Sequence, residues 1–326
     1  MKNTLIISHK SDIDGMGSVI LSKIAFNKVD YLLFLNPTDL GNSFDKMMND
    51  KIFDKYDNIY ICDLSLVKPY IDIVNNDIDL KSKIKIFDHH QKAIEQGLDK
   101  YEFCTIKEKD IKKRCGTELF YEYLCNNNLI NKNNILDSFV EKIRLEDNWE
   151  WKKYGDFGIK AHDLSYLYTI QGPDLFIDTF VNKLIKTDEL NEEEQKLVDD
   201  YKKDINKTME EYLSSALFMV DENGIEYITL FCDYKYRNDI TDYIESIYGY
   251  KYKYVVIVAL DNGKYGQKSY RSIDPSIDVN EICIKYNGGG HPGAAAVLIN
   301  KTQREEINNL KKEEALKYIV TCSYEE

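Results

Sequence analysis

The sequence predicts two α/β domains, the first of which contains a mostly parallel, doubly wound sheet. Short apolar runs alternate with amphipathic stretches through the first third of the chain, and this β-α alternation is typical of a parallel sheet. Three of the runs end next to acidic or histidine residues, as expected where parallel strands end and ligands bind. A strand pattern returns after a long charge-rich stretch, which predicts a second, smaller α/β domain.

In the first predicted domain, residues 1–188, apolar runs indicate strands, and 3.6-residue apolar spacing indicates helices. The expected strands are 4–8, 31–35, 58–62 and 83–87. The expected helices are 15–25, 44–53, 135–145 and a helix that Thr117 caps and that runs through Leu124. Residues 164–184 also have helical spacing, and His162 is expected to open a helix.

Residues 189–215 are predicted to connect the domains, because 189–212 are rich in charge and contain no proline or glycine. Residues 216–326 form the second predicted domain. Its expected strands are 226–231, 253–260 and 267–272, with a tight turn at Asp261-Asn262-Gly263. Its expected helices are 239–247, 279–286 and 304–319.

Composition limits the function classes. The chain has 326 residues, 43% of them hydrophobic and 30% charged, as in ordinary globular proteins. A net charge of -13 disfavours an extensive non-specific interface with duplex nucleic acid, which needs many Lys and Arg contacts to phosphate. It is compatible with a short nucleotide whose phosphates are held by metal ions.

The seven scattered cysteines form no C-x-x-C pair, which favours free thiols in a reducing compartment. No apolar run approaches the ~18 to 20 residues of a membrane span, and no signal peptide is apparent. We therefore expect a cytoplasmic protein without a membrane partner. The sequence does not determine the oligomeric state, and a homodimer is one alternative.

The candidate site is organised around Ile86-Phe87-Asp88-His89-His90, where a predicted strand ends on an acid and two histidines. His9, Asp12 and Asp14 follow the first strand, and Asp63 follows the third. Imidazole and carboxylate ligands together suit a divalent metal ion. Each of these residues alone is more often structural, but five such groups after three strands favour a metal site.

Two other readings of the Asp12-Ile13-Asp14-Gly15 segment fit less well. A calcium loop of the EF-hand type requires an Asp or Asn at the position of Met16 and a Glu at the position of Lys23, and both are absent. A phosphatase of the haloacid-dehalogenase type places its first aspartate at the end of a strand, whereas this strand ends three residues earlier, at His9.

These motifs resemble those of the DHH phosphoesterases that carry a DHHA1 domain. The segment His9 to Gly15, Asp63, Asp88-His89-His90 and the segment Asn287 to Ala295 follow the family's motif order over nearly the whole chain. Asp147 matches a fourth acidic motif. The neighbouring tryptophans Trp149 and Trp151 and the segment Ala161 to Leu164 are most similar to the B-type nano-RNases, which are oligoribonucleases. The first motif departs slightly, because two residues separate His9 from Asp12.

The resemblance implies two divalent metal ions, with manganese favoured and magnesium as the alternative. One ion would be held by His9, Asp12 and Asp63. The other would be held by Asp14, Asp63, His89 and Asp147, so that Asp63 bridges. Two such ions activate a shared hydroxide for in-line attack on phosphorus. Asp88 would orient a histidine, and His90 would face the scissile phosphate as a hydrogen-bond donor or acid.

The second domain is expected to hold the far end of the substrate. By resemblance, the residues involved are Arg271, Gly288, Gly289, Gly290 and His291. Glycine amides can approach a phosphate closely, and arginine binds phosphate in a bidentate manner, although a glycine run is also common in plain turns. His162 is expected to cap a helix or to pack, with a substrate contact as the less favoured alternative. Trp149 and Trp151 are expected to lie in the core or in the wall of a cleft.

The function expected from this pattern is a metal-dependent phosphodiesterase that cuts short RNA or DNA oligonucleotides to 5′-mononucleotides at a cleft between the domains. Hydrolysis of a cyclic dinucleotide or of 3′-phosphoadenosine 5′-phosphate remains an alternative, because metal ions recognise phosphate and not base. A nucleotide- or RNA-binding module without activity is the alternative from another class.

Overall fold

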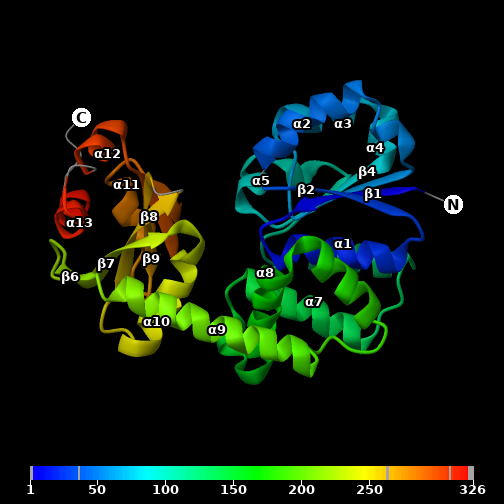
Figure 1. The fold of residues 1–326 in the computed structure, drawn as a ribbon. Helices are drawn as coiled ribbons and strands as arrows, with labels where there is room; N and C mark the ends of the chain where they lie inside the picture. Colours follow the sequence, from blue (N-terminus) through cyan, green and yellow to red (C-terminus); the bar gives the residue numbers. More distant parts are fainter. Residues whose placement is uncertain (1–2, 36, 262–263, 308–309, 322–326) are drawn as a thin grey trace. The chain divides into compact units, whose positions relative to one another are not determined.

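The structure is a computed structural model that describes residues 3–35, 37–261, 264–307 and 310–321 (Figure 1). The chain divides into two compact units, Met1–Asp199 and Asp200–Glu326. Asn262 and Gly263 of the predicted turn and the last cysteine, Cys322, lie outside the described residues. None of the described helices has the length and apolarity needed to cross a membrane.

The first unit contains a five-stranded sheet in the order β2-β1-β3-β4-β5, and all neighbouring strands are parallel. The strands are β1 (Thr4–His9), β2 (Val29–Phe34), β3 (Asn58–Cys62), β4 (Ile84–Asp88) and β5 (Cys104–Ile106). The predicted fold class is therefore confirmed. Strands are added on one side of β1 and then on the other, which makes the β1–β3 junction the switch point where ligands bind in such sheets.

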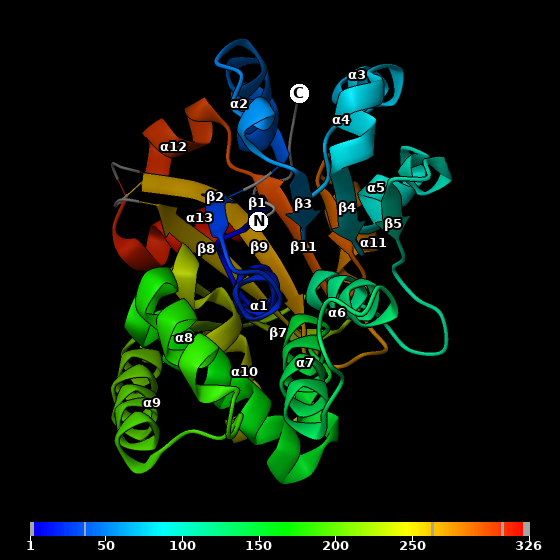
Figure 2. The same cartoon turned by 90° about the vertical axis from the view of Figure 1, so that its right-hand side faces the viewer.

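Helices cover both faces of this sheet (Figure 2). One face is covered by α1 (Ile13–Ala25), α6 (Gly116–Asn126), α7 (Asn134–Asp147) and α8 (Gly155–Lys183). The other is covered by α2 (Pro37–Asn49), α3 (Lys68–Asn76), α4 (Ile78–Lys83) and α5 (Gln91–Glu95), and short 3₁₀ turns occur at Phe53–Lys55, Leu98–Lys100 and Trp151–Lys153. Side chains alternate between the faces along each strand: Ile6 packs with the first set of helices, whereas Leu5 and Ile7 pack with the second.

Several predicted helix boundaries were wrong. The residue that precedes α6 is Cys115, and Thr117 lies inside the helix with its amide bonded to Asp14. Helix α7 does not stop at Leu145 but continues to Asp147. Helix α8 begins before His162 and kinks at Gly172, which has φ 71° and is followed by Pro173.

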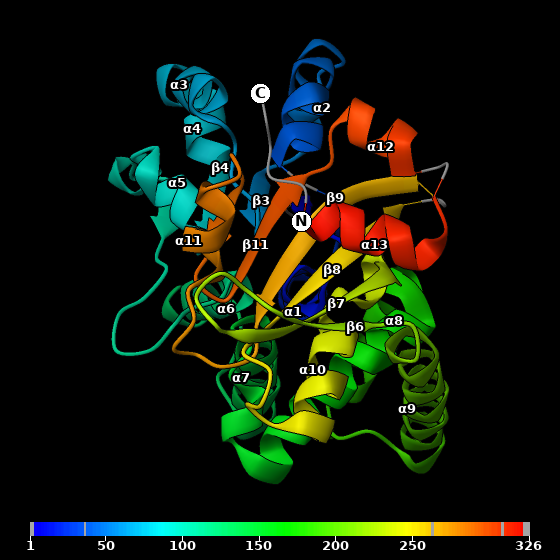
Figure 3. The ribbon, with the colours of Figure 1, turned by 90° about the vertical axis from the view of Figure 1, so that its left-hand side faces the viewer.

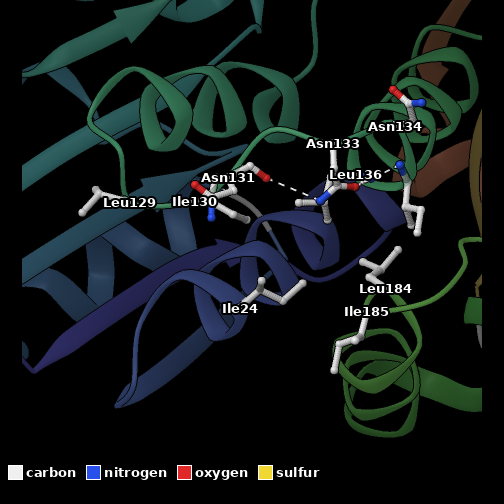
Figure 4. Close-up of a pocket in the computed structure, with 10 residues that line it drawn as sticks. Ile24, Leu129, Ile130, Asn131, Asn133, Asn134, Leu136, Leu184 and Ile185 are labelled. Carbon is white, nitrogen blue, oxygen red and sulfur yellow. Dashed lines mark hydrogen bonds between the residues drawn. The ribbon is translucent and has the colours of Figure 1, made fainter.

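An open hollow of about 570 Å³ lies beside the end of α1 (Figure 4). Its wall includes Ile24, Leu129 and Leu184, and Asn133 lies at its edge with the side-chain oxygen accepting from the amide of Leu136 at 3.0 Å. None of the predicted ligands lines this hollow. It is therefore separate from the candidate site.

The second unit contains a six-stranded sheet in the order β10-β11-β9-β8-β7-β6, shown in Figure 3. Only the β7–β8 pair is parallel among its described strands. The strands are β6 (Leu217–Val220), β7 (Glu226–Asp233), β8 (Tyr254–Asp261), β9 (Lys264–Ser272), β10 (Gly289–His291) and β11 (Ala294–Leu298). The helices are α10 (Arg237–Tyr248), α11 (Val279–Ile284), α12 (Lys301–Ile307) and α13 (Lys312–Thr321), with a 3₁₀ turn at Tyr234–Tyr236.

The second sheet also buries apolar side chains. Val256 and Val279 pack in a cluster beneath α11, and Val258 and Leu316 pack in a cluster beneath α12 and α13. The single helix predicted over 304–319 is thus two helices, α12 and α13. The long helix α9 (Glu192–Leu213) lies within the segment predicted to connect the domains, and the division between the two units falls inside it. The functional roles assigned to the two domains stay predictions.

The six described cysteines are free thiols. Cys62, Cys104, Cys115, Cys232 and Cys283 are buried, and Cys125 is half-buried. Burial raises the pKa of the Cys104 and Cys232 thiols to about 12. These thiols therefore stay protonated and poorly reactive in the folded protein.

Candidate metal centre

The carboxyl ends of β1, β3 and β4 bring imidazole and carboxylate groups together at the switch point. His9 ends β1, Asp63 follows β3, and Asp88 ends β4 directly before His89. Asp12 and Asp14 come from the start of α1, and Asp147 is the last residue of α7. All six predicted metal ligands lie in the first unit.

Three of these residues form the first group: His9, Asp12 and Asp63. Nδ1 of His9 lies 3.0 Å from Oδ2 of Asp12 and 3.5 Å from Oδ2 of Asp63. Nε2 of His9 donates to the carbonyl of Leu35 at 2.8 Å, so the ring is held with Nδ1 toward the carboxylates. Although burial lowers it, the hydrogen bond to Asp12 and the nearby Asp63 carboxylate raise the pKa of His9 to about 11, so a proton occupies Nδ1 unless a cation replaces it.

The second group surrounds His89. Its Nε2 lies 3.3 Å from Oδ1 of Asp63, 3.6 Å from Oδ2 of Asp147 and 3.8 Å from Oδ2 of Asp14. Burial and the nearby carboxylates raise the pKa of Asp14 well above its usual value and that of Asp147 to about 7. Asp63 faces both groups, which is the position that a bridging ligand needs.

Asp14 is held by backbone groups that sequence reasoning missed. Gly116 N donates to Oδ2 and Thr117 N to Oδ1, each at 2.7 Å, so the start of α6 binds this carboxylate. A Cβ on Gly116 would lie 2.8 Å from Cα of Asp63. Only glycine permits this approach, and the Gly116-Thr117 pair in the sequence is the signal that could have been used.

Asp88 and His90 form a hydrogen-bonded pair next to the two groups, and His90 also forms a candidate metal-holding group with Asp63 and His89. Nδ1 of His90 donates to Oδ1 of Asp88 at 2.7 Å, and the amides of His89 and His90 donate to the same oxygen at 2.8 and 3.2 Å. The hydroxyl of Ser65 donates to the other oxygen of Asp88. Burial opposes it, but Asp88 raises the pKa of His90 to about 9. Both carboxylate oxygens of Asp88 thus already accept hydrogen bonds, and one of these bonds orients the ring of His90.

The donor set fits two divalent cations. Asp12, Asp14, Asp63 and Asp147 carry together the charge that two such cations would balance. Three buried atoms of the set, Asp63 Oδ2, His89 Nε2 and Asp147 Oδ2, have no hydrogen-bond partner. Buried polar atoms are rarely left unpaired, so these atoms are suited to ligation.

The predicted substrate residues lie in the second unit. Arg271 is in β9, and Gly289 to His291 form the strand β10, which pairs with β11. The expected glycine loop is therefore partly a strand, because its amides pair with Ala294 to Ala296. The side chain of His291 lies outside the described part of the structure.

His162 has both a carboxylate partner and an aromatic partner, which is more than a packing residue requires. Its Nδ1 lies 3.0 Å from Oε2 of Glu146, and its ring stacks on Trp151 with centroids 4.1 Å apart. Trp149 is 40% exposed. Trp151 therefore packs against His162, whereas Trp149 is exposed to solvent.

Comparison with known proteins agrees with these motifs. Residues 3–143 match the DHH family, N-terminal domain. The chain is similar to this family over those residues. It is also 26% identical over 305 residues to oligoribonuclease NrnB of Bacillus subtilis (strain 168), an alignment that covers 90% of this chain and 72% of the relative. The resemblance to DHH phosphoesterases of the nano-RNase type is thereby confirmed.

Solved structures share the fold. A DHH domain from a protein described as belonging to a family of ribosomal proteins gives a TM-score of 0.60 at 15% identity, covering 99% of this chain and 88% of that one. The pGpG-specific phosphodiesterase PggH of Vibrio cholerae gives 0.54 at 14% identity, covering 94% and 96%. At these identities the likeness establishes the fold alone.

Proposed function

We propose that this DHH protein is a metal-dependent phosphodiesterase that hydrolyses short oligonucleotides to 5′-mononucleotides. The observation that carries the proposal is the convergence of four carboxylates and two imidazoles at the switch point, with three of their buried atoms lacking partners. The similarity to an oligoribonuclease over 90% of the chain supports hydrolysis of phosphoester bonds as the reaction and short RNA as the substrate.

The first ion would be held by His9, Asp12 and Asp63, and the second by Asp14, Asp63, His89 and Asp147. Two bound divalent cations would neutralise the phosphate oxygens and lower the pKa of a coordinated water. Mixed imidazole and carboxylate ligands favour manganese over calcium.

The protein's own groups prepare the site for this reaction. Leu35 O and the amides of Gly116 and Thr117 fix His9 and Asp14 before substrate arrives, which lowers the cost of reorganisation. His90 has its Nδ1 held by Asp88, so Nε2 is the atom that would donate to a phosphate oxygen or to the leaving group.

The decisive experiment is product analysis on RNAs of two to five nucleotides with purified full-length protein and Mn²⁺, compared with short DNA, cyclic dinucleotides and 3′-phosphoadenosine 5′-phosphate. We expect 5′-mononucleotides from the short RNA, and faster turnover on it than on the rest of the panel. Preference for a cyclic dinucleotide or for 3′-phosphoadenosine 5′-phosphate would replace this substrate by that alternative. Binding without turnover of any substrate would favour the binding module.

A further inference from the structure

Trp149 occupies a backbone position that normally favours glycine. Its amide donates to the carbonyl of Glu146 at 3.0 Å, and the amide of Glu150 donates to the carbonyl of Leu145 at 2.8 Å. These two bonds end α7 in a Schellman motif, in which the residue at this position is usually glycine. Trp149 has φ 57° and has the largest side chain among the described non-glycine residues with positive φ. Because a bulky side chain is strained in this region, the backbone gives no reason for tryptophan here.

Packing does not explain this tryptophan either. The side chain of Trp149 is 40% exposed, and a large apolar side chain contributes to stability in proportion to the area that it buries. A tryptophan that is both strained and exposed therefore adds little to the stability of the fold. Residues in such unfavourable backbone conformations cluster at active sites and ligand-binding sites, which favours a functional explanation for Trp149.

Two neighbouring rings hold the Trp149 indole in a defined orientation. The rings of Trp151 and His162 stack in parallel, with centroids 4.1 Å apart and an angle of 4° between their planes. Trp149 is nearly perpendicular to both rings, at 79° to Trp151 and 83° to His162, with centroids 6.4 and 6.1 Å away. Edge-to-face contacts of this kind are favourable between aromatic groups. Since perpendicular rings cover at most one face of the indole, the pair leaves the other face uncovered.

The aromatic cluster is also connected to the candidate metal centre. Nδ1 of His162 lies 3.0 Å from Oε2 of Glu146, which directly precedes the predicted metal ligand Asp147. Trp149 follows that ligand by two residues. A phosphodiester joins two nucleosides, so any phosphate held at Asp147 has a base on either side. Trp149 is thus an exposed aromatic ring close in the chain to the group that would hold the phosphate.

We propose that Trp149 stacks on a nucleobase of the substrate, on one of the two nucleotides joined by the scissile phosphate. Every base has a flat π-face, so stacking tolerates any sequence, and it requires no positive charge from a chain whose net charge is -13. Trp151 and His162 act as positioning residues that hold the indole. This inference rests on the proposed function for its substrate class, and it gives Trp149 a contact with substrate that the sequence did not indicate.

The test measures the Kd of a dinucleotide in which a methylene group replaces the bridging 3′ oxygen, because this linkage keeps its charge and resists hydrolysis. Full-length protein with Mn²⁺ is titrated with a probe that carries both bases, or that lacks the first or the second base. We expect the loss of one base to weaken wild-type binding by about fivefold to a hundredfold. Trp149→Gly should weaken binding of the complete probe by a similar factor, and should leave the Kd of the probe without that base within about twofold.

Intrinsic fluorescence gives a second measurement, because Trp149 and Trp151 are the only tryptophans of the chain. A base stacked on an indole quenches its emission. Trp151→Phe leaves Trp149 as the only indole, and its emission should be quenched by the complete probe more than by the probe without the stacked base. Trp149→Phe leaves only Trp151 and should show little quenching, although the phenyl ring keeps part of the affinity.

The matched control is Tyr154→Ala, which removes another exposed aromatic ring of the first unit and should keep the wild-type Kd for every probe. Trp149→Gly should not lower the thermal unfolding midpoint, because glycine is favoured at this position. Wild-type affinity in Trp149→Gly, or equal weakening with and without the base, would overturn the proposal. So would wild-type binding that depends on neither base. Absence of hydrolysis of short RNA would overturn the proposed function and leave these binding results standing.

Discussion

At the scale of single residues, Asp63 combines a chemical role with an unusual backbone position. It faces both candidate metal groups, and its φ of 54° lies in the left-handed region that Gly, Asn and Asp tolerate best. We expect Asp63→Asn to lower kcat by about a hundredfold or more, because even indirect disturbance of metal ligands costs tenfold to a hundredfold. The measurement is kcat with saturating Mn²⁺, together with metal content.

Asp63→Ala separates the two roles. It should lose activity as Asp63→Asn does, but should also lose about 1 kcal/mol of unfolding free energy relative to Asp63→Asn, because alanine is strained at this φ. Urea titration of both variants measures the difference. Turnover above a tenth of the wild-type rate with unchanged metal content would contradict the bridging role.

Two neighbouring glycines, Gly288 and Gly289, are predicted to differ in how well they tolerate a side chain. A Cβ on Gly288 would lie 2.4 Å from the carbonyl of Ala296, whereas at Gly289 the nearest atom is Oδ1 of Asn280 at 3.9 Å. Gly288→Ala should therefore destabilise the second unit, while Gly289→Ala should fold normally and raise KM if the segment holds substrate. Steady-state kinetics and thermal unfolding of both variants decide this. Unchanged kinetics in Gly289→Ala would return the segment to a structural role.

Residue types at strand ends predicted five of the six candidate ligands, and Asp147 came from the resemblance to the family's fourth acidic motif. Each of these ligands has a side chain that the sequence displays. The groups that hold those ligands could not be predicted in the same way. The carbonyl of Leu35 and the amides of Gly116 and Thr117 are backbone groups. Any residue carries them, so only the folded chain shows their role.

At the scale of elements, α7 depends on a buried arginine. Arg144 is 1% exposed and contacts Glu141 and Glu150 at 2.7 Å. Arg144→Met should lower the unfolding free energy by about 3 kcal/mol, the lower end for a broken buried ion pair, because both glutamates keep some contact with water. Urea unfolding measures this loss.

Lys203→Met is the control for that variant. Lys203 and Asp200 form an ion pair 3.1 Å apart in which both side chains are more than half exposed, so its loss should cost no more than about 1 kcal/mol. Equal losses in the two variants would show that burial does not determine the contribution of Arg144.

The strands show where sequence patterns are sufficient to predict secondary structure. Strands β1, β3 and β4 were predicted to within one residue because buried parallel strands are continuous apolar runs. The short strand β5, with three residues, was missed, as was β6, with four. Both form at a sheet edge through pairing with a neighbour, and such pairing depends on the fold more than on local preference.

At the scale of the whole molecule, metal binding should stabilise the first unit. Because the ligands come from β1, β3, β4, α1 and α7, they assemble only in the folded state, and a cation at a hundred times its Kd adds about 2.7 kcal/mol per site. We expect Mn²⁺ to raise the thermal unfolding midpoint and a chelator to reverse the increase. Asp63→Asn should show little of this shift, and a full shift in that variant would place the stabilising ion elsewhere.

Net charge sets an expectation for substrate length. At -13 the protein offers little long-range attraction to extended polyanions. We therefore predict that kcat/KM is highest for about two to five nucleotides and falls for longer RNA. Measurements across a length series at fixed salt test this. A steady rise with length would instead indicate a processive exonuclease.

The buried thiols give the protein internal reporters of local opening. An alkylating reagent reaches a buried cysteine only when the surrounding structure transiently unfolds, so the labelling rate measures the free energy of that opening. Cys62 adjoins Asp63, and Cys115 precedes the helix that holds Asp14, whereas Cys232 lies in the other unit. Peptide-resolved labelling would thus report how far a cation bound at the switch point suppresses motion around it, with Cys232 as the reference in the same sample.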